Sequence, residues 1–276
     1  MSYKYLVIAS KKDSAGIGIT TALSQFRKNP ILSSMDKDPS VFDFYLVDKE
    51  TLYTENLNIE KINNYDFIIF ASKHQSEKKE KTLSIHAPGN WRKADFGGES
   101  GKICGSSGLF QKFLFEKLCE NAKKFKLDEY AITLECTHHG PLLSKPCVFI
   151  EIGSTEKEWA DRRAAFVISK TIAETIEEFK ENPYREVAVG IGGPHYCPNF
   201  NKIQLDSNVA LSHIIPQYSL PLSEEMIREA IAKTKEEIDF FLLDWKGLGN
   251  SEQRQQALDV LNKLGTSYKK ISEINK

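Results

Sequence analysis

The chain has 276 residues, of which 41% are hydrophobic, 11% aromatic and 27% charged. This composition is typical of a globular protein and excludes the disordered, collagen-like and coiled-coil classes. The formal net charge is −1, so any nucleic acid would have to be bound by a local basic patch. The apolar runs are too short to span a bilayer, and the five cysteines form no CxxC pair. We therefore expect a cytoplasmic protein without a membrane segment.

The first half of the chain predicts strands that alternate with helices. Helix 14–28 begins at an N-cap, Asp13 or Ser14, and ends before Pro30. Residues 91–105 are rich in glycine and show no periodicity, so we expect a long loop there. Helix 106–125 then begins at Ser106 or Ser107. The predicted strands of this half are 3–10, 42–48, 65–72 and 82–86.

The second half continues the alternation of strands and helices. Long helices are predicted over 156–182 and 223–245, and a last helix begins at Ser251 and ends at Gly265. The predicted strands of this half are 130–136, 146–152, 186–191 and 208–215. The alternation predicts an α/β fold with a mixed, mostly parallel sheet flanked by helices. We expect one unit over 1–276. If it has two closely packed lobes, of about 1–80 and 81–276, the crossover lies near 73–81.

Five of the six histidines follow or end predicted strands. They are His74, His86, His138, His139 and His195, whereas His213 lies inside a strand and is interpreted as a hydrogen-bonded structural residue. In open α/β sheets the carboxyl ends of the strands form the ligand crevice. We therefore expect these five imidazoles to meet in one site.

Such a cluster supports metal-assisted or general-base catalysis. Three neutral imidazoles can bind Zn²⁺ and leave one position open for water. Glu135 and Glu151 lie in otherwise apolar strands, where a carboxylate is costly unless it is paired or binds a metal. A structural ion pair with a lysine or arginine is the alternative for each of them.

Strand parity limits how the residues around His138 can act together. In an extended segment Glu135, Thr137 and His139 share one face, and Cys136 and His138 share the other. His138 and His139 therefore point to one atom only if the strand ends between them, and Gly140-Pro141 predicts a turn there. Cys136 is either a nucleophile or, more in keeping with a buried strand cysteine, inert packing.

One near-motif fails. Residues 13–21 start like GxGxxG, but Thr21 replaces the third glycine, so we interpret the segment as a helix N-terminus that could hold an anion. Walker A, HExxH and GxSxG motifs are absent from the sequence, which argues against phosphate-transfer enzymes and covalent serine hydrolases.

Five motifs, in order, resemble those of the archaeal and plant type of D-aminoacyl-tRNA deacylase. They are Ser72-Lys-His74, Leu83-Ser-Ile-His86-Ala-Pro88-Gly89-Asn90, Glu135-Cys-Thr-His138-His139-Gly140-Pro141, Phe149-Ile-Glu151-Ile-Gly153-Ser154-Thr155 with Trp159, and Gly190-Ile-Gly192-Gly193-Pro-His195-Tyr196. The resemblance implies hydrolysis of the ester between a D-amino acid and the 3′ end of tRNA. It also implies dependence on Zn²⁺ and a fold similar to peptidyl-tRNA hydrolase and nucleoside phosphorylases.

The resemblance leads to a set of expected site residues. We expect catalytic roles for His86, His138, His139 and Glu135, and metal binding by His74, His195 and Glu151. Water activated by the metal or by a histidine would attack the ester. Substrate contacts are expected from Gly89, Asn90, Gly192 and Gly193, whose N–H groups could stabilise an oxyanion, and from Lys102.

The tRNA is expected to meet two further features. Its terminal phosphates could lie at the helix N-terminus near 106–108. Lys78, Lys79, Lys81, Arg92 and Lys93 form a locally basic strip. A solvated charged face is the alternative for the strip, because Glu77 and Glu80 interleave it.

Three other functions remain open at this point. One is a metal-free peptidyl-tRNA hydrolase-like esterase, and the second is a nucleoside phosphorylase-like enzyme. The third is a non-catalytic RNA-binding protein, which the near-neutral charge and the placement of the histidines argue against. The expected assembly is a monomer or a small oligomer.

Overall fold

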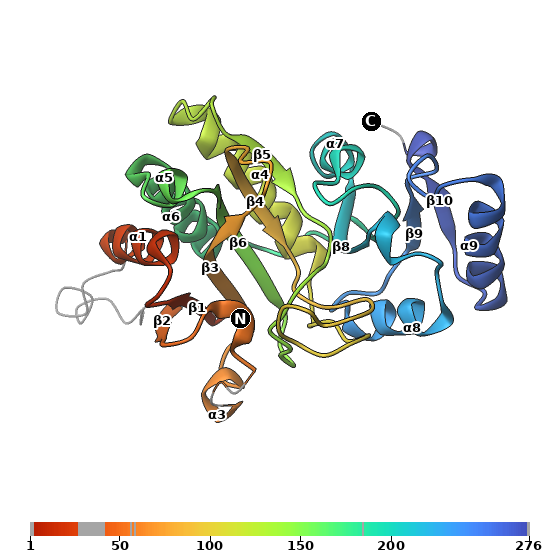
Figure 1. Cartoon of the computed structure of the whole chain (residues 1–276), viewed down its shortest axis with the longest axis horizontal. Helices are drawn as coiled ribbons and strands as arrows, with labels where there is room; N and C mark the ends of the chain where they lie inside the picture. Colours follow the sequence, from red (N-terminus) through yellow and green to blue (C-terminus); the bar gives the residue numbers. More distant parts are fainter. Residues whose placement is uncertain (1–2, 27–41, 56, 58, 184, 275–276) are drawn as a thin grey trace.

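The computed structural model describes residues 3–26, 42–55, 57, 59–183 and 185–274. Within them two sheets lie side by side, one built from the first half of the chain and one from the second (Figure 1). The larger sheet has the strand order β2-β1-β3-β6-β4-β5. Its strands are β1 (Tyr5–Ser10), β2 (Phe42–Val47), β3 (Phe67–Gln75), β4 (Thr82–His86), β5 (Ala131–Leu134) and β6 (Cys147–Ser154).

The smaller sheet is parallel throughout and has the order β10-β9-β7-β8. Its strands are β7 (Glu186–Ile191), β8 (Val209–Ile215), β9 (Phe240–Leu243) and β10 (Tyr268–Lys270). In the larger sheet only β4 and β6 pair antiparallel; the other neighbouring strands pair parallel. The predicted α/β fold with a mixed, mostly parallel sheet is therefore confirmed. Segment 73–81, the expected lobe crossover, joins β3 and β4 of the same sheet.

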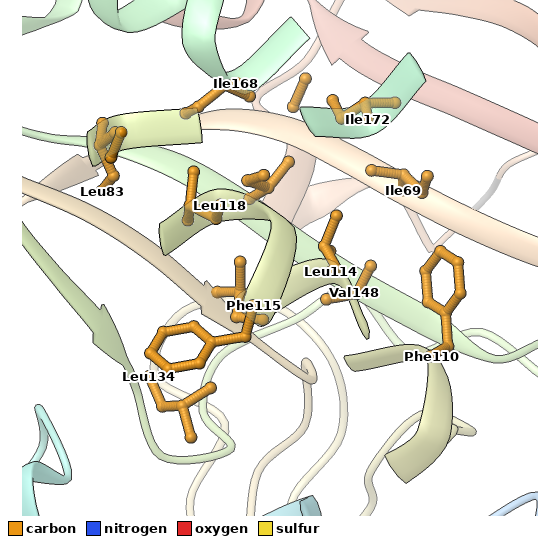
Figure 2. Packing of buried hydrophobic residues seen from close by; sticks show 14 of the residues in the cluster. Ile69, Leu83, Phe110, Leu114, Phe115, Leu118, Leu134, Val148, Ile168 and Ile172 are labelled. Atoms are coloured by element: carbon orange, nitrogen blue, oxygen red, sulfur yellow. The ribbon is translucent and has the colours of Figure 1, made fainter. Parts of the chain in front are cut away.

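Helices cover one face of the larger sheet. These are α1 (Ser14–Leu23), α4 (Gly108–Lys124) and α6 (Arg162–Glu178). Leu114 and Phe110 of α4 and Ile168 of α6 pack there on Ile69 and Val148 of the sheet (Figure 2). Because side chains alternate along a strand, this apolar face takes every second residue of β3, β4 and β6 and leaves the others for the opposite face.

The smaller sheet has its own core, formed with α8 (Glu224–Lys233) and α9 (Ser251–Lys263). Among the residues that the structure describes, the remaining helices are α3 (Ile59–Ile62), α5 (Glu156–Trp159) and α7 (Pro198–Asp206), and short 3-10 turns cover 24–26, 51–53, 217–219 and 271–273. In the described part of the chain, no helix is long and apolar enough to cross a membrane.

The predicted helix 223–245 is wrong beyond Lys233. The main chain of Lys233 and Lys235 pairs with Ser106, and Thr234 is extended, so the helix ends there. The apolar run Phe240–Leu243 then enters the smaller sheet as β9, buried on both faces. A continuous apolar run of this length is ambiguous between helix and strand.

Other boundaries also differ from those expected. The helix predicted over 156–182 is two helices, because the Asp161 carboxylate accepts hydrogen bonds from Arg163 and Ala164 and starts α6 anew. The first helix ends at Leu23, followed by a 3-10 turn, and its expected end near residue 28 and Pro30 lies outside the described residues. Helices α3 and α7 and strand β10 were not predicted.

Candidate active site

The face of the larger sheet opposite the helices carries a polar patch. Glu151 of β6 pairs in register with Ser72 of β3 and Ser84 of β4, so the three side chains share a face. One pleat to either side on this face lie His74 of β3 and His86 of β4. Glutamate and histidine thus come from neighbouring strands that are far apart in the sequence.

Loops that connect the two sheets complete the site. After β5, Glu135 N–H donates to Ile85 in β4, Cys136 N–H donates to the His195 carbonyl, and Thr137 N–H donates to Ile214 in β8. This short segment therefore ties the larger sheet to the smaller one. It also carries His138 and His139 over the polar patch and holds His195 against them.

The imidazoles expected to meet do meet. The ring centroid of His86 lies 4.2 Å from that of His138 and 4.8 Å from that of His139. The ring of His195 lies 4.5 Å from that of His138 and 6.0 Å from that of His74. We call these side chains, with the two carboxylates, the histidine cluster: His74, His86, Glu135, His138, His139, Glu151 and His195.

The reason for this convergence differs from the one expected. Strands β4 and β5 run antiparallel to β6, so their carboxyl ends do not share an edge with those of β3 and β6. The cluster instead gathers on the sheet face, because His74, His86 and Glu151 follow the same parity. His138 and His139 can both join because β5 has already ended at Leu134, and His139 has a left-handed backbone with φ 40°.

Three of the imidazoles are held in the same way by the main chain. His86 Nδ1 lies 3.2 Å from the Ala87 carbonyl, His138 Nδ1 lies 2.8 Å from the Cys136 carbonyl, and His139 Nδ1 lies 2.6 Å from the Gly140 carbonyl. A carbonyl only accepts, so each Nδ1 must carry the proton. Each Nε2 is then left with a lone pair for a proton or a metal ion.

The two carboxylates form the buried base of the cluster. Glu135 Oε2 lies 3.1 Å from His195 Nε2 and 3.5 Å from His138 Nε2. Glu151 Oε2 lies 3.5 Å from His86 Nε2 and 3.6 Å from His74 Nδ1. Neither carboxylate side chain is more than 3% exposed, whereas His195 is 33% exposed, so the cluster opens to solvent on the His195 side.

The charges of the cluster follow from burial and from these contacts. Burial lowers the pKa of His138 well below its usual value and that of His139 to about 4, so both are neutral at pH 7. Burial opposes ionisation of Glu151, but the facing His74 and His86 outweigh it and lower its pKa. Burial also opposes protonation of His195, but contacts with Cys136 and Glu135 raise its pKa to about 10.

Besides its residue types, the cluster has a second feature that suits a zinc ion. Three of its buried polar atoms make no hydrogen bond: His86 Nε2, Glu135 Oε1 and Glu151 Oε2. Buried polar groups are normally paired. Ligand atoms of His86, His138 and His139 lie within 4.8 Å of one another, as do those of His74, Glu135 and His195. The unpaired atoms and nitrogen-rich donor sets suit Zn²⁺.

The expected oxyanion donors are engaged elsewhere. Gly89 N–H donates to the carbonyls of His138 and His139, and Asn90 N–H donates to Lys102. Gly192 N–H donates to Ile215 and Gly193 N–H to Gly247. These N–H groups hold the loops of the site together, and a role for these residues as substrate contacts stays a prediction. Lys102 itself is half-exposed and pairs with Glu229.

Both helix N-termini that were expected to hold anions already have carboxylates. Asp13 accepts from Ala15 and Gly16 at the start of α1, and its second oxygen accepts from Lys73 N–H. At the start of α4, Glu236 accepts from the N–H groups of Gly108 and Leu109. Neither end is free for a phosphate, which corrects both expectations. In the basic strip, Arg92 donates to the carbonyls of Ser219 and Pro221.

Two tyrosines at the edge of the cluster were not singled out. The Tyr196 hydroxyl lies 2.9 Å from His74 Nε2, and the Tyr218 hydroxyl lies 2.9 Å from Cys136 Sγ. Cys136 is buried and its sulfur lies 3.5 Å from His195 Nδ1. The position of Tyr196 directly after His195 was a usable signal. His213 stays outside the cluster, as expected, with its ring against Thr137 and the Lys233 carbonyl.

Comparisons with known proteins agree on one family. A family model described as D-aminoacyl-tRNA deacylase matches residues 61–269, which include the whole cluster. A D-aminoacyl-tRNA deacylase of Methanocaldococcus jannaschii is 33% identical over 97% of this chain and 100% of its own length. One of Pyrococcus furiosus is 38% identical over 74% of this chain and 73% of its own. A crystal structure titled as a conserved protein of unknown function aligns with a TM-score of 0.87 and 28% identity, covering 99% of both chains.

Proposed function

The chain belongs to the D-aminoacyl-tRNA deacylase family, and from this membership we propose that it hydrolyses the ester joining a D-amino acid to the 3′ end of tRNA. Water adds a hydroxyl to the acyl carbon, the bond from that carbon to the ribose oxygen breaks, and the ribose oxygen takes up a proton. The products are the free D-amino acid and tRNA ready for correct charging. Because charged tRNA is the substrate, we place the reaction in the cytoplasm.

The observation that supports the proposal is the histidine cluster with its unpaired atoms. Imidazoles and carboxylates come from β3, β4, β6 and the loops after β5 and β7, yet three of their buried polar atoms make no hydrogen bond. These atoms lie 3.3–3.6 Å from facing groups of the cluster without making a hydrogen bond, and a buried polar group that lacks its hydrogen bond costs about 1–3 kcal/mol. Such atoms can bind a metal ion or contact an ester during its hydrolysis.

We propose that His86, His138 and His139 hold the metal ion. Each offers an Nε2 lone pair that the main chain fixes in place through Nδ1. The set His74, His195 and Glu151, expected from the sequence, is less suited, because His74 Nε2 faces Tyr196 and His195 faces Glu135 and Cys136. Bound Zn²⁺ would supply Lewis acidity and lower the pKa of a water molecule to about 7.

The remaining residues of the cluster handle protons and charge. The ionised carboxylates of Glu135 and Glu151 can accept the proton that water loses on attack, through the oxygens that face imidazoles of the cluster but make no hydrogen bond. His195, protonated and nearest to solvent, places positive charge where the carbonyl oxygen of the ester becomes negative. Tyr196 and Glu135 orient His74 from opposite sides of its ring.

The test is a comparison of D-tyrosyl-tRNA with L-tyrosyl-tRNA, each incubated with the purified protein. We expect release of D-tyrosine and intact L-tyrosyl-tRNA. Equal hydrolysis of both would contradict the D-selectivity, and activity on an N-blocked aminoacyl-tRNA alone would favour the peptidyl-tRNA hydrolase alternative.

A further inference from the structure

A cavity of about 670 Å³ opens directly beside the histidine cluster. The ring of His195, the part of the cluster nearest to solvent, and the ring of His74 form part of its wall. Other parts of the wall come from the start of β4, from β5, from the loop between β7 and α7 and from α7 itself: Thr82, Ile132, Thr133, Pro194, Tyr196 and Asn201. Its volume lies in the range of small-molecule sites.

One side chain in this wall gives evidence that the cavity binds a ligand. Thr82 is only 1% exposed, and its hydroxyl makes no hydrogen bond to the described residues. A hydroxyl can donate one hydrogen bond and accept two, and leaving all of them unmade in the interior is costly. Thr133 and Asn201 differ, because they are engaged with each other and with the Tyr196 carbonyl.

The Thr82 hydroxyl packs closely against a glycine. Thr82, Gly153 and His74 lie in one row across β4, β6 and β3. A Cβ added at Gly153 would lie 2.4 Å from Thr82 Oγ1 and 2.9 Å from His74 Cδ2. Any other residue at position 153 would therefore collide with the Thr82 hydroxyl and the His74 ring, so glycine is what lets the two side chains lie on either side of β6.

The cavity wall otherwise combines flat apolar surfaces with neutral polar groups. Ile132, Pro194, Pro198 and the Tyr196 ring supply the apolar surfaces, and Lys78, Glu77 and Glu80 lie at the exposed rim. Apolar and aromatic surfaces suit the faces of a nucleobase, and a neutral hydroxyl suits its hydrogen-bonding edge.

We propose that this cavity binds the terminal adenosine of the tRNA, with the Thr82 hydroxyl hydrogen-bonded to the nucleoside. The proposal rests on the proposed function, because the ribose must then reach the cluster with its ester next to His195. The nucleoside is the part of an aminoacyl-tRNA that stays the same for every amino acid. A fixed, buried hydroxyl suits such an invariant partner better than it suits side chains that vary in size and polarity.

The test uses Thr82→Val, which removes the hydroxyl and keeps the shape and the strand preference. Thr175→Val is the matched control, because Thr175 is another buried threonine whose hydroxyl has no partner, located in α6 away from the cavity. We expect the KM of Thr82→Val for D-tyrosyl-tRNA to rise about 3- to 10-fold, the effect of one neutral hydrogen bond. Its kcat should stay within about twofold, since the residue touches no reacting atom, and Thr175→Val should match the wild type.

A competition experiment identifies the ligand. Adenosine 5′-monophosphate should inhibit hydrolysis by the wild type and inhibit Thr82→Val more weakly, whereas cytidine 5′-monophosphate and D-tyrosine amide should compete less. Inhibition by D-tyrosine amide but not by the adenosine nucleotide would overturn the proposal. An unchanged KM in Thr82→Val would also overturn it, and neither result would contradict the proposed deacylase activity. A wild-type protein that releases no D-tyrosine would instead contradict the proposed function, and calorimetry with adenosine 5′-monophosphate would still test the cavity.

Discussion

Two buried polar regions of this protein differ in how completely they are paired. The histidine cluster leaves hydrogen-bonding atoms open on His86, Glu135 and Glu151. The second region, here called the seam network, lies between α4, β8 and the end of α8. Its members make hydrogen bonds to one another or to the main chain: Ser106, Gln111, Ser212, His213 and Thr234.

This difference in hydrogen bonding indicates a different role for each region. In the seam network, Gln111 donates to Ser106, Ser106 donates to the Ser212 carbonyl, and the Ser212 and Thr234 hydroxyls lie 2.9 Å apart. A satisfied network of this kind fixes how the two sheets pack. The cluster bridges the same two sheets yet leaves atoms unpaired, which is a cost to stability that a ligand can offset. We therefore expect changes in the cluster to affect chemistry and changes in the seam network to affect stability.

Removal of metal should produce the largest effect. After dialysis against a chelator we expect hydrolysis of D-tyrosyl-tRNA to fall to background, and Zn²⁺ to restore it where Mg²⁺ does not, since imidazole donors favour zinc. Zinc content per chain should fall in parallel and should also fall in His86→Ala. Full activity in protein shown to be free of metal would contradict this prediction.

Replacement of a cluster histidine should come next. His139→Ala should lower kcat/KM by about 10²- to 10⁴-fold, because it removes a metal ligand or proton acceptor at the reacting centre. The melting temperature of the metal-free variant should be close to that of the metal-free wild type, since the His139 ring makes its hydrogen bond to the adjacent Gly140 carbonyl. Normal turnover in both His139→Ala and His86→Ala would remove the cluster from the mechanism.

A change in the seam network should do the opposite. Gln111→Leu removes the donor to Ser106 and to the Ser212 carbonyl, and we expect a loss of about 1–3 kcal/mol in the free energy of unfolding. Urea unfolding measures this loss. At a temperature where the variant is folded, its kcat should remain near that of the wild type; a large fall in kcat with no loss of stability would reverse the roles assigned to the two regions.

The smallest expected effect is a pH dependence of stability in the seam network. Burial lowers the pKa of His213 to about 4, below its unfolded value of about 6.5. The unfolded chain therefore binds a proton between these pH values while the folded chain does not, so stability is complete above pH 6.5 and is lost as pH falls toward 4. At pH 5 the loss is about 2 kcal/mol. In His213→Gln, the difference between the unfolding free energies at pH 7 and pH 5 should shrink by that amount; an unchanged difference would contradict it.

The sequence predicts the alternation of elements, because the alternation depends on local periodicity. It also predicts that the five histidines meet, although the reason it offers, a shared edge at the strand ends, is not the one that brings them together. It does not predict that β4 pairs antiparallel to β6, since pairing direction depends on contacts between distant segments. The sequence therefore leads to a crevice at strand ends, whereas His74, His86 and Glu151 in fact share a sheet face.

The sequence also does not predict which polar groups already have hydrogen-bond partners in the folded protein. Gly89, Gly192 and Gly193 have the type and spacing of oxyanion donors, but the loops they belong to use their N–H groups. Glu236 lies more than a hundred residues after α4 and still caps its N-terminus. Similarly, nothing around Thr82 in the sequence reveals that its hydroxyl is left without a partner.

The most direct test of the cluster's role is the rate of D-tyrosyl-tRNA hydrolysis by Glu151→Gln, measured together with its free energy of unfolding. This substitution keeps the shape of the side chain and removes the charge that faces His74 and His86. We predict a fall in kcat of at least about 10²-fold with stability equal to or above that of the wild type. A variant that turns over at the wild-type rate, or that loses activity only because it unfolds, would contradict the account.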